Sequence, residues 1–318
     1  MTIDRVATNM QSQIMLGQIQ QDENALQQTQ TQVATGLVST TYGGIGANTD
    51  MMESARSQGA LATGYAAAAQ LGANQANLQD TQLSQLASLA GQLQQDLTTA
   101  VANNDGSTLM SQAQSIFDQA LQILNSQDAN GNYIYSGGKA GTPPVTVSSL
   151  SALQALPSAS NAFANGTQKS AVQVGANETV QVGVLASDVG TQLFQTLQDV
   201  ANFNSGGNGN FGQQLTSTQS SFLTNEIQSA QSASQSLNNA VGGNGTVYQQ
   251  LQSAVTQQQN LSDMYQGFVS DVQDADMATT ASKLSQNQTA LQAALEVTAQ
   301  LNQVSLLNYL GSGSAVIG

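Results

Sequence analysis

Residues 281–310 read ASKLSQNQTALQAALEVTAQLNQVSLLNYL and contain neither glycine nor proline. Their apolar side chains recur at helical spacing among glutamine, asparagine, threonine and serine, which predicts a long amphipathic helix. Residues 3–35 carry a weaker stripe of the same kind. Apolar stripes at both ends are typical of ends that pair with each other and with neighbouring copies. The candidate assembly interface therefore comprises Ile3, Val6, Met10, Ile14, Leu284, Leu291, Leu295, Leu301, Val304 and Leu310.

The composition limits the kind of core that this chain can build. Only 8% of its 318 residues are charged and 4% are aromatic, and it has no tryptophan. Typical soluble domains are roughly a quarter charged. Bulky side chains are too few for a large globular core, but long helices with alanine, leucine and glutamine seams can still pack.

The charge balance argues against two classes of partner. The chain has 19 acidic and 5 basic residues, a net charge of −14, and its cations are scattered one by one. Binding to nucleic acid or to an anionic membrane surface needs clustered lysine and arginine. No stretch approaches the roughly 18 apolar residues of a membrane helix. We therefore expect neither nucleic-acid binding nor membrane insertion.

Several kinds of catalytic and metal site are excluded by residue type. The chain has no histidine and no cysteine, so the usual general base, the Ser–His triad and thiolate chemistry are absent. Residues 128–132 begin like a calcium loop, but Tyr133 replaces the glycine and Lys139 the bidentate acid that such a loop needs. They predict an Asx-rich turn instead. We expect no enzymatic activity and no cofactor or metal.

Three carboxylates lie close together before the C-terminal stripe, and they have two simple structural interpretations. Asp271, Asp274 and Asp276 fall within six residues. Such a group usually forms a solvated face or caps a helix that restarts, and we favour these interpretations over a metal cluster.

The pattern along the chain predicts a mainly α fold with a small β domain. Alternating apolar and polar residues at 171–184 indicate a β-hairpin. The stretch Val-Gly-Gly-Asn-Gly at 241–245 predicts a tight connection between two antiparallel helices. The expected helices are 3–35, 49–102, 107–126, one beginning near 188, 211–240 and 246–310.

This order predicts an elongated antiparallel helical rod or coiled coil, formed by the N- and C-terminal regions, with a central module that contains the hairpin. We expect three domains. The paired terminal helices comprise residues 1–42 and 276–318, the helical rod 43–138 and 189–275, and the small β domain 139–188.

Two terminal motifs resemble the flagellin superfamily of bacterial axial proteins. The C-terminal one is Asp271-Val-Gln-Asp-Ala-Asp-Met-Ala, followed by Leu284 and the helix to Leu310. The N-terminal one combines Arg5-Val-Ala-Thr-Asn-Met with Gln32-Val-Ala-Thr-Gly-Leu. The glycine-rich segment after Gly36 departs from the acidic stretch usual in that superfamily. Three further features are similar to its hook–filament junction proteins: residues 131–137, the hairpin at 171–184 and the ending 305–310.

The resemblance implies a structural subunit of the bacterial flagellum that joins hook to filament. It implies self-assembly through the terminal helices, contact with an adjacent hook-associated protein and with flagellin, and help from an export chaperone. It also implies an extracellular location after export as an unfolded chain. Residues 1–5 do not begin a conventional signal peptide, so we expect a dedicated export route without a cleaved signal.

Other readings remain open from the sequence. A bulk filament flagellin would share both terminal motifs. A secreted tip or adhesin-type fibre protein would share the long helices, although an adhesin needs a surface anchor and a pore-forming translocator needs long apolar helices.

Overall fold

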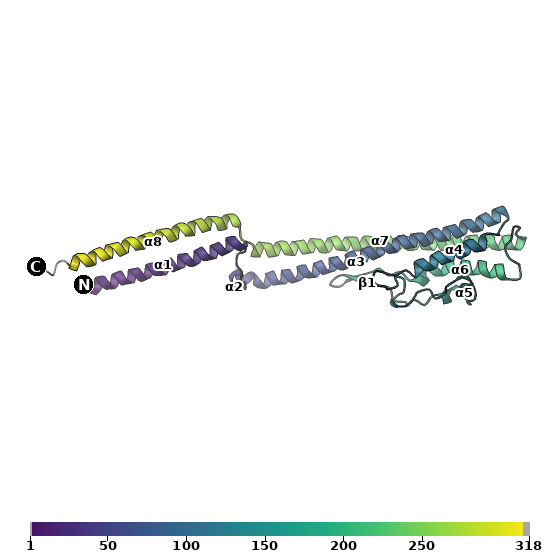
Figure 1. Cartoon of the computed structure of the whole chain (residues 1–318), viewed down its shortest axis with the longest axis horizontal. Helices are drawn as coiled ribbons and strands as arrows, with labels where there is room; N and C mark the ends of the chain where they lie inside the picture. The colour runs from purple at the N-terminus through teal and green to yellow at the C-terminus, as the bar shows by residue number, and fades with distance from the viewer. Residues whose placement is uncertain (1, 314–318) are drawn as a thin grey trace. The chain divides into compact units, whose positions relative to one another are not determined.

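A computed structural model of the chain describes the backbone of residues 2–313 and the side chains of residues 10–303. Contacts divide the chain into unit 1, residues 1–59 with 263–318, and unit 2, residues 60–262. The elements, most of them labelled in Figure 1, are α1 (Thr2–Thr35), α2 (Tyr42–Ile45), η1 (Gly46–Asn48), α3 (Thr49–Asn103), α4 (Leu109–Leu124), α5 (Leu150–Gln154), η2 (Ala159–Ala162), β1 (Ala171–Gly175), β2 (Glu178–Gln181), α6 (Ala186–Ser205), α7 (Ser217–Gln273) and α8 (Met277–Gly313).

The predicted fold class is confirmed: the chain is mainly helical with one small antiparallel sheet. The division into three domains stays a prediction, and the boundary between the two contact units falls within α3 and α7. No helix of the described residues is both long and apolar enough to cross a bilayer.

In unit 2, α3 and α7 pack along a heptad seam. Buried positions of α7 recur at alternating steps of four and three residues, which is the 3.5-residue period of a left-handed coiled coil. Ser234 Oγ donates to the Ala87 carbonyl at 3.5 Å and Asn244 Nδ2 to the Ala76 carbonyl at 2.7 Å, so the helices run antiparallel. The buried seam residues of α7 in this unit include Gln219, Leu223, Glu226, Ala230, Ala233, Leu237, Asn244, Leu251, Ala254 and Gln258.

The prediction of a helical hairpin turn at 241–245 is wrong, because α7 runs unbroken through this segment. Leu237, Asn244 and Leu251 are all buried at seven-residue spacing, so the seam continues across the glycines. Each glycine costs roughly 1 kcal/mol relative to alanine in a helix, but packing against α3 outweighs that propensity. The chain breaks instead at residues 274–276, between α7 and α8.

The main core of unit 2 lies where α4 and α6 join the α3–α7 pair. Phe117 of α4 and Phe194 of α6 are fully buried, with ring centroids 5.1 Å apart. The Phe163 ring lies 5.3 Å from that of Phe194. The apolar residues of 83–124 belong to this core: Leu83, Leu93 and Leu124 are fully buried, and Leu121 is half-buried.

A second apolar cluster seats the β-hairpin on the helix pair. Val174 of β1 and Val180 of β2 pack with Ala73 of α3 and Leu251 of α7. The strands pair antiparallel, as predicted for 171–184, with Val172 opposite Val180. Gln258 Nε2 donates to the Val174 carbonyl at 2.9 Å and fastens the hairpin to α7.

The Asx-rich turn predicted at 128–132 is confirmed. Asp128 Oδ1 accepts hydrogen bonds from the backbone N–H of Asn130 at 2.8 Å and of Asn132 at 2.9 Å. Gly131 has a φ of +81°, a left-handed conformation that glycine adopts without strain. Residues 132–135, which follow this turn and include Tyr133 and Tyr135, form no regular strand; Tyr133 makes a single β-bridge with Gln127.

Candidate assembly interface

In unit 1, α1 and α8 pair along a second heptad seam. The described residues that face the partner helix recur at steps of four and three on both helices. On α1 they are Met15, Ile19, Asp22, Leu26, Thr29 and Val33, and on α8 they are Thr280, Leu284, Asn287, Leu291, Ala294 and Thr298. Figure 1 shows the two helices side by side, with the chain running in opposite directions along them.

Polar side chains in this seam fix the register. Asn287 Nδ2 donates to Thr29 Oγ1 at 2.8 Å and to the Ala25 carbonyl at 3.2 Å. Near the other end, Thr298 Oγ1 lies 3.9 Å from the Met15 sulfur. Thr29 is 5% exposed, which makes this polar layer the most enclosed part of α1 that the structure describes.

The ten predicted interface residues fall into three groups. Leu284 and Leu291 are half-buried in the seam, three residues before and four residues after Asn287. Met10, Ile14, Leu295 and Leu301 are exposed, at 63%, 65%, 49% and 38%. The side chains of Ile3, Val6, Val304 and Leu310 lie outside the described residues.

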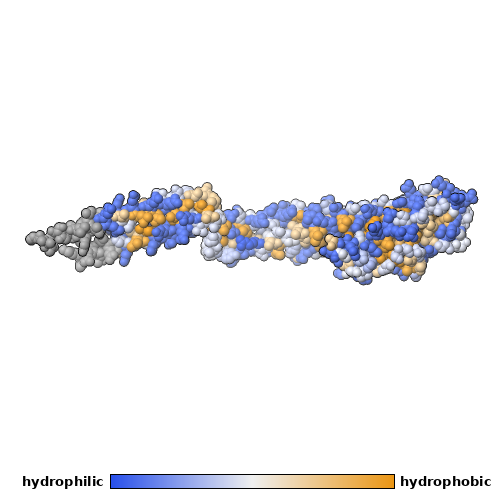
Figure 2. All heavy atoms as spheres, viewed as in Figure 1, coloured by the Kyte–Doolittle hydropathy of each residue, from blue (hydrophilic) through white to orange (hydrophobic). Residues whose placement is uncertain are grey.

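Pairing within one chain therefore leaves a second apolar surface uncovered. Figure 2 shows apolar surface along the α1–α8 pair, among polar neighbours. We call the exposed apolar residues on either side of this seam the outer stripe; they are Met10, Ile14, Leu16, Leu295, Val297 and Leu301, each at least 38% exposed. Their number on two paired helices exceeds the scattered single hydrophobics of an ordinary protein surface.

The seam itself was only partly anticipated from sequence. The residues nearest to α8 include Met15, Ile19 and Leu26, whereas the N-terminal candidates were Met10 and Ile14. The missing signal was the heptad: positions 15, 19, 22, 26, 29 and 33 alternate by four and three, but Asp22 and Thr29 interrupt their apolar pattern.

A compact joint connects α1 to the start of α3 and the end of α7. Leu37 and Asp274 form an antiparallel bridge, in which the Val38 N–H donates to the Gln273 carbonyl and the Ala275 N–H to the Gly36 carbonyl, both at 2.8 Å. Arg56 donates through Nη2 to Gln273 Oε1 at 3.0 Å and pairs with Glu53 at 2.8 Å.

The predicted helix-restart cap lies in this joint and is confirmed. Asp276 Oδ1 accepts from the backbone N–H of Ala278 at 3.0 Å and of Thr279 at 3.3 Å, at the first turn of α8. Thr279 Oγ1 also donates to Asp276 Oδ2 at 2.7 Å, and this bond, followed by the two backbone N–H bonds, holds the pKa of the Asp276 carboxyl below its usual range. No cluster of three or more potential metal-binding acids occurs among the described side chains.

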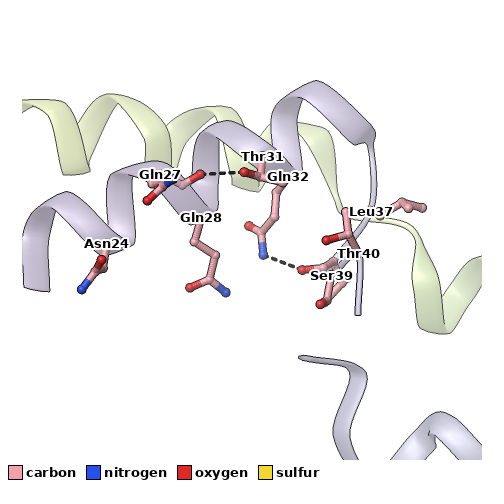
Figure 3. A pocket seen from close by; sticks show the side chains of 9 residues that line it. Asn24, Gln27, Gln28, Thr31, Gln32, Leu37, Ser39 and Thr40 are labelled. Atoms are coloured by element: carbon pink, nitrogen blue, oxygen red, sulfur yellow. Dashed lines mark hydrogen bonds between the residues drawn. The ribbon is translucent and has the colours of Figure 1, made fainter. Parts of the chain in front are cut away.

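A polar hollow of unit 1 lies along α1, beside the joint. It has a volume of about 300 Å³, and its lining includes Asn24, Gln28 and Ser39 (Figure 3). Two of its side chains bond to backbone carbonyls: Gln32 Nε2 to Val38 at 2.8 Å and Thr31 Oγ1 to Gln27 at 2.9 Å. Its walls are amides, hydroxyls, one leucine and one valine, a set without a nucleophile–base pair.

The C-terminal part of the chain matches a known protein family, and most of the chain has counterparts in solved structures. Residues 227–310 match the bacterial flagellin C-terminal helical region. No curated protein sequence matches the chain. A structure described as a flagellar hook-associated protein from Vibrio parahaemolyticus is 12% identical with a TM-score of 0.58, and the match covers 71% of this chain and 97% of that one. Bacillus cereus FlgL is 10% identical with a TM-score of 0.52, covering 69% and 98%.

At 10% and 12% identity, the similarity to the two solved structures shows a shared fold and nothing further. The family match over residues 227–310 confirms the predicted resemblance to the flagellin superfamily, and the two hook-associated proteins share the fold of this chain. That superfamily consists of structural proteins rather than enzymes.

Proposed function

We propose that this chain is a structural subunit of the bacterial flagellum that joins hook to filament. The flagellin-type C-terminal region at 227–310 supports the broader part of the proposal. The narrower part, the junction role, draws support from the fold shared with two hook-associated proteins, whose chains are covered almost completely. The alternative is a bulk filament flagellin, and a secreted tip or adhesin-type fibre is a second one.

In the proposed mechanism of assembly, adjacent copies of the chain contact each other through their outer stripes. Met10, Ile14 and Leu295 are each about half exposed or more, although they lie on helices whose seam is already filled. Burying a leucine-sized side chain contributes roughly 1.5–3 kcal/mol. Contact between the outer stripes of adjacent copies therefore stabilises an assembly without opening the α1–α8 seam.

The same proposal defines partners and location. The chain assembles with identical subunits, contacts an adjacent hook-associated protein and flagellin at its two faces, and binds an export chaperone before assembly. Its location is extracellular, reached by export as an unfolded chain. The predicted interface residues Ile3, Val6, Val304 and Leu310, whose side chains lie outside the described residues, belong to the same proposed interface.

Electron microscopy of the purified chain tests the junction role against the filament role. The chain is salted out alone, with preformed filament seeds and with isolated hooks. A junction protein forms short rings or caps, or binds only at hook ends, because it needs the hook as a template. Long helical filaments from this chain alone would contradict the junction role and favour the filament alternative.

A pair of charge substitutions tests the outer stripe itself. Ile14→Asp places a carboxylate on the stripe, whereas Gln13→Asp places the same charge on the adjacent exposed polar position. We expect Ile14→Asp to abolish incorporation at hook ends and Gln13→Asp to leave it near the native level. Both monomers should keep native helicity by circular dichroism, since neither residue lies in the α1–α8 seam. Normal incorporation of a folded Ile14→Asp chain would show that the stripe is no interface.

A further inference from the structure

A buried carboxylate lies in the α3–α7 seam of unit 2, far in sequence from the assembly stripe. Glu226 of α7 occupies a heptad position and is only 8% exposed. Its Oε2 atom is buried and has no hydrogen-bond partner among the described residues. A charged carboxylate in this position has a high free-energy cost, because the protein interior supplies neither the water that hydrates it in solution nor a counter-ion.

The neighbouring helices bring further acids to Glu226 instead of bases. Phe203 of α6 stacks on Phe222 of α7 with ring centroids 3.9 Å apart, and one turn farther along each helix this packing brings Asp199 toward Glu226. Asp199 Oδ1 accepts from Gln195 Nε2 at 3.0 Å. On α3, the Ser234–Ala87 contact sets the antiparallel register and puts Asp96 at about the level of Glu226. Asp96 Oδ1 accepts from Gln112 Nε2 of α4 at 3.2 Å, and its Oδ2 is buried without a partner.

The cations of unit 2 are used elsewhere. Residues 60–262 contain two basic side chains, Lys139 and Lys169. Lys139 Nζ donates to the Ala164 carbonyl at 2.9 Å, and Lys169 Nζ pairs with Asp188 at 2.8 Å. Within α7 the nearest favourable group is Ser229, whose hydroxyl bonds to Glu226. Glu226 therefore has Asp199 near it and Asp96 at about its level on α3, and both basic side chains of its unit are engaged elsewhere.

These surroundings favour the neutral acid. Burial, and secondly the charge of Asp199, raise the pKa of Glu226 to about 7. In an unfolded chain the group has an ordinary glutamate pKa near 4.3. Between these two values the folded chain binds the additional proton, so the free energy of unfolding falls as pH rises through the window.

We propose that Glu226 and Asp199 form a proton-controlled contact between α6 and α7: the helices pack tightly while Glu226 holds a proton and loosen when the proton leaves. No bond other than the O–H bond of Glu226 is made or broken. The loosened state differs from the packed state only around this contact between α6 and α7. Acidification thus stiffens this part of unit 2, and mild alkali softens it.

Thermal unfolding of the full-length monomer between pH 5 and pH 8.5 tests the proposal. We expect the native midpoint to fall by about 5 °C across this range. Glu226→Gln, which keeps the shape and removes the charge, should lose most of this fall. Glu178→Gln on the exposed strand β2 is the matched control and should retain it. A fall in Glu226→Gln equal to that of the native chain would overturn the proposal.

A second variant keeps the test decisive if Glu226→Gln folds poorly. Asp199→Asn removes the neighbouring charge and leaves Glu226 in place, so the pH at which the midpoint falls should shift downward. Amide hydrogen exchange around residues 195–200 and 223–230, corrected for intrinsic rates, should be faster at pH 8 than at pH 6 in the native chain. An unshifted transition in Asp199→Asn, or equal protection at both pH values, would overturn the contact.

Discussion

Asn287 in α8 and Thr29 in α1 are joined by a 2.8 Å hydrogen bond, although 258 residues separate them in the sequence. The bond lies in the middle of the described seam, where Leu26 and Leu291 are apolar neighbours. A single polar layer in a coiled-coil seam lowers stability but selects one register, because any slipped pairing leaves its groups without partners. The register of the α1–α8 pair therefore depends on this contact more than on the leucines.

Replacing Asn287 by leucine should separate stability from register. We expect Asn287→Leu to keep the helices paired but to allow more than one alignment, whereas Gln288→Leu at the adjacent exposed position should keep a single one. The chain has no cysteine, so paired spin labels at Gln20→Cys and Gln292→Cys report the alignment without background. A narrow distance distribution in Asn287→Leu, identical to that of the native chain, would show that the polar layer does not set the register.

Two glycine substitutions should have opposite effects on stability. Gly243 lies on the exposed side of α7, and a Cβ there would meet no atom within 4 Å. Gly243→Ala should raise the free energy of unfolding by about 0.5–1 kcal/mol, because alanine is the better helix former.

Gly72, by contrast, lies under the hairpin, where a Cβ would come within 2.9 Å of Val172 Cγ2, so its substitution should affect the same free energy of unfolding in the opposite direction. Gly72→Ala should lower it by about 1–3 kcal/mol. Urea unfolding measures both; a loss in Gly243→Ala would mean that the glycines serve a bend or hinge.

At the glycines of residues 241–245, the structure differs from the prediction made from the sequence. Local propensity indicated a turn at 241–245, but the heptad that continues from Leu237 through Asn244 to Leu251 keeps the helix intact. Elements with one strong periodicity, such as residues 3–35 and 49–102, were predicted within a few residues of their observed ends. The hairpin at 171–184 was predicted from its alternation and turn.

The interface was harder to predict than the elements. Helical spacing identifies an apolar face, but α1 and α8 each carry two adjacent ones, and spacing does not tell the intramolecular seam from the outer stripe. Leu291 and Leu295 are one turn apart, yet the first is half-buried and the second is exposed. The two faces can be told apart only once the position of the partner helix is known, and the hydrogen bond between Asn287 and Thr29 fixes that position.

The Asp276 cap should make the start of α8 sensitive to acid. Its pKa is lowered by hydrogen bonds from Thr279 and Ala278, so the cap stabilises the first turn above the usual aspartate pKa of about 3.9. The stabilisation is lost as pH falls through the lowered value, because a protonated carboxyl accepts these N–H groups less well. Amide exchange at residues 278–280 should therefore rise toward pH 3 in the native chain. In Asp276→Asn, which caps without a charge, exchange corrected for intrinsic rates should be independent of pH. An equal rise in both chains would assign the acid sensitivity to another group.

The Tyr135 hydroxyl should contribute to stability through one buried hydrogen bond to α3. Tyr135 is fully buried, and its hydroxyl donates to Gln82 Oε1 at 2.9 Å. Burial raises the pKa of Tyr135 well above the usual value for tyrosine. Tyr135→Phe leaves the Gln82 carbonyl oxygen without this donor, so unfolding should become easier by about 1–2 kcal/mol. Tyr133→Phe, two residues earlier and half-buried, should change stability by less than about 0.5 kcal/mol.

In an alkaline titration followed by ultraviolet absorbance, the native folded chain should retain one protonated tyrosine that Tyr135→Phe lacks. Equal titration curves for the native chain and Tyr135→Phe, after allowance for one fewer tyrosine, would contradict the buried hydroxyl contact.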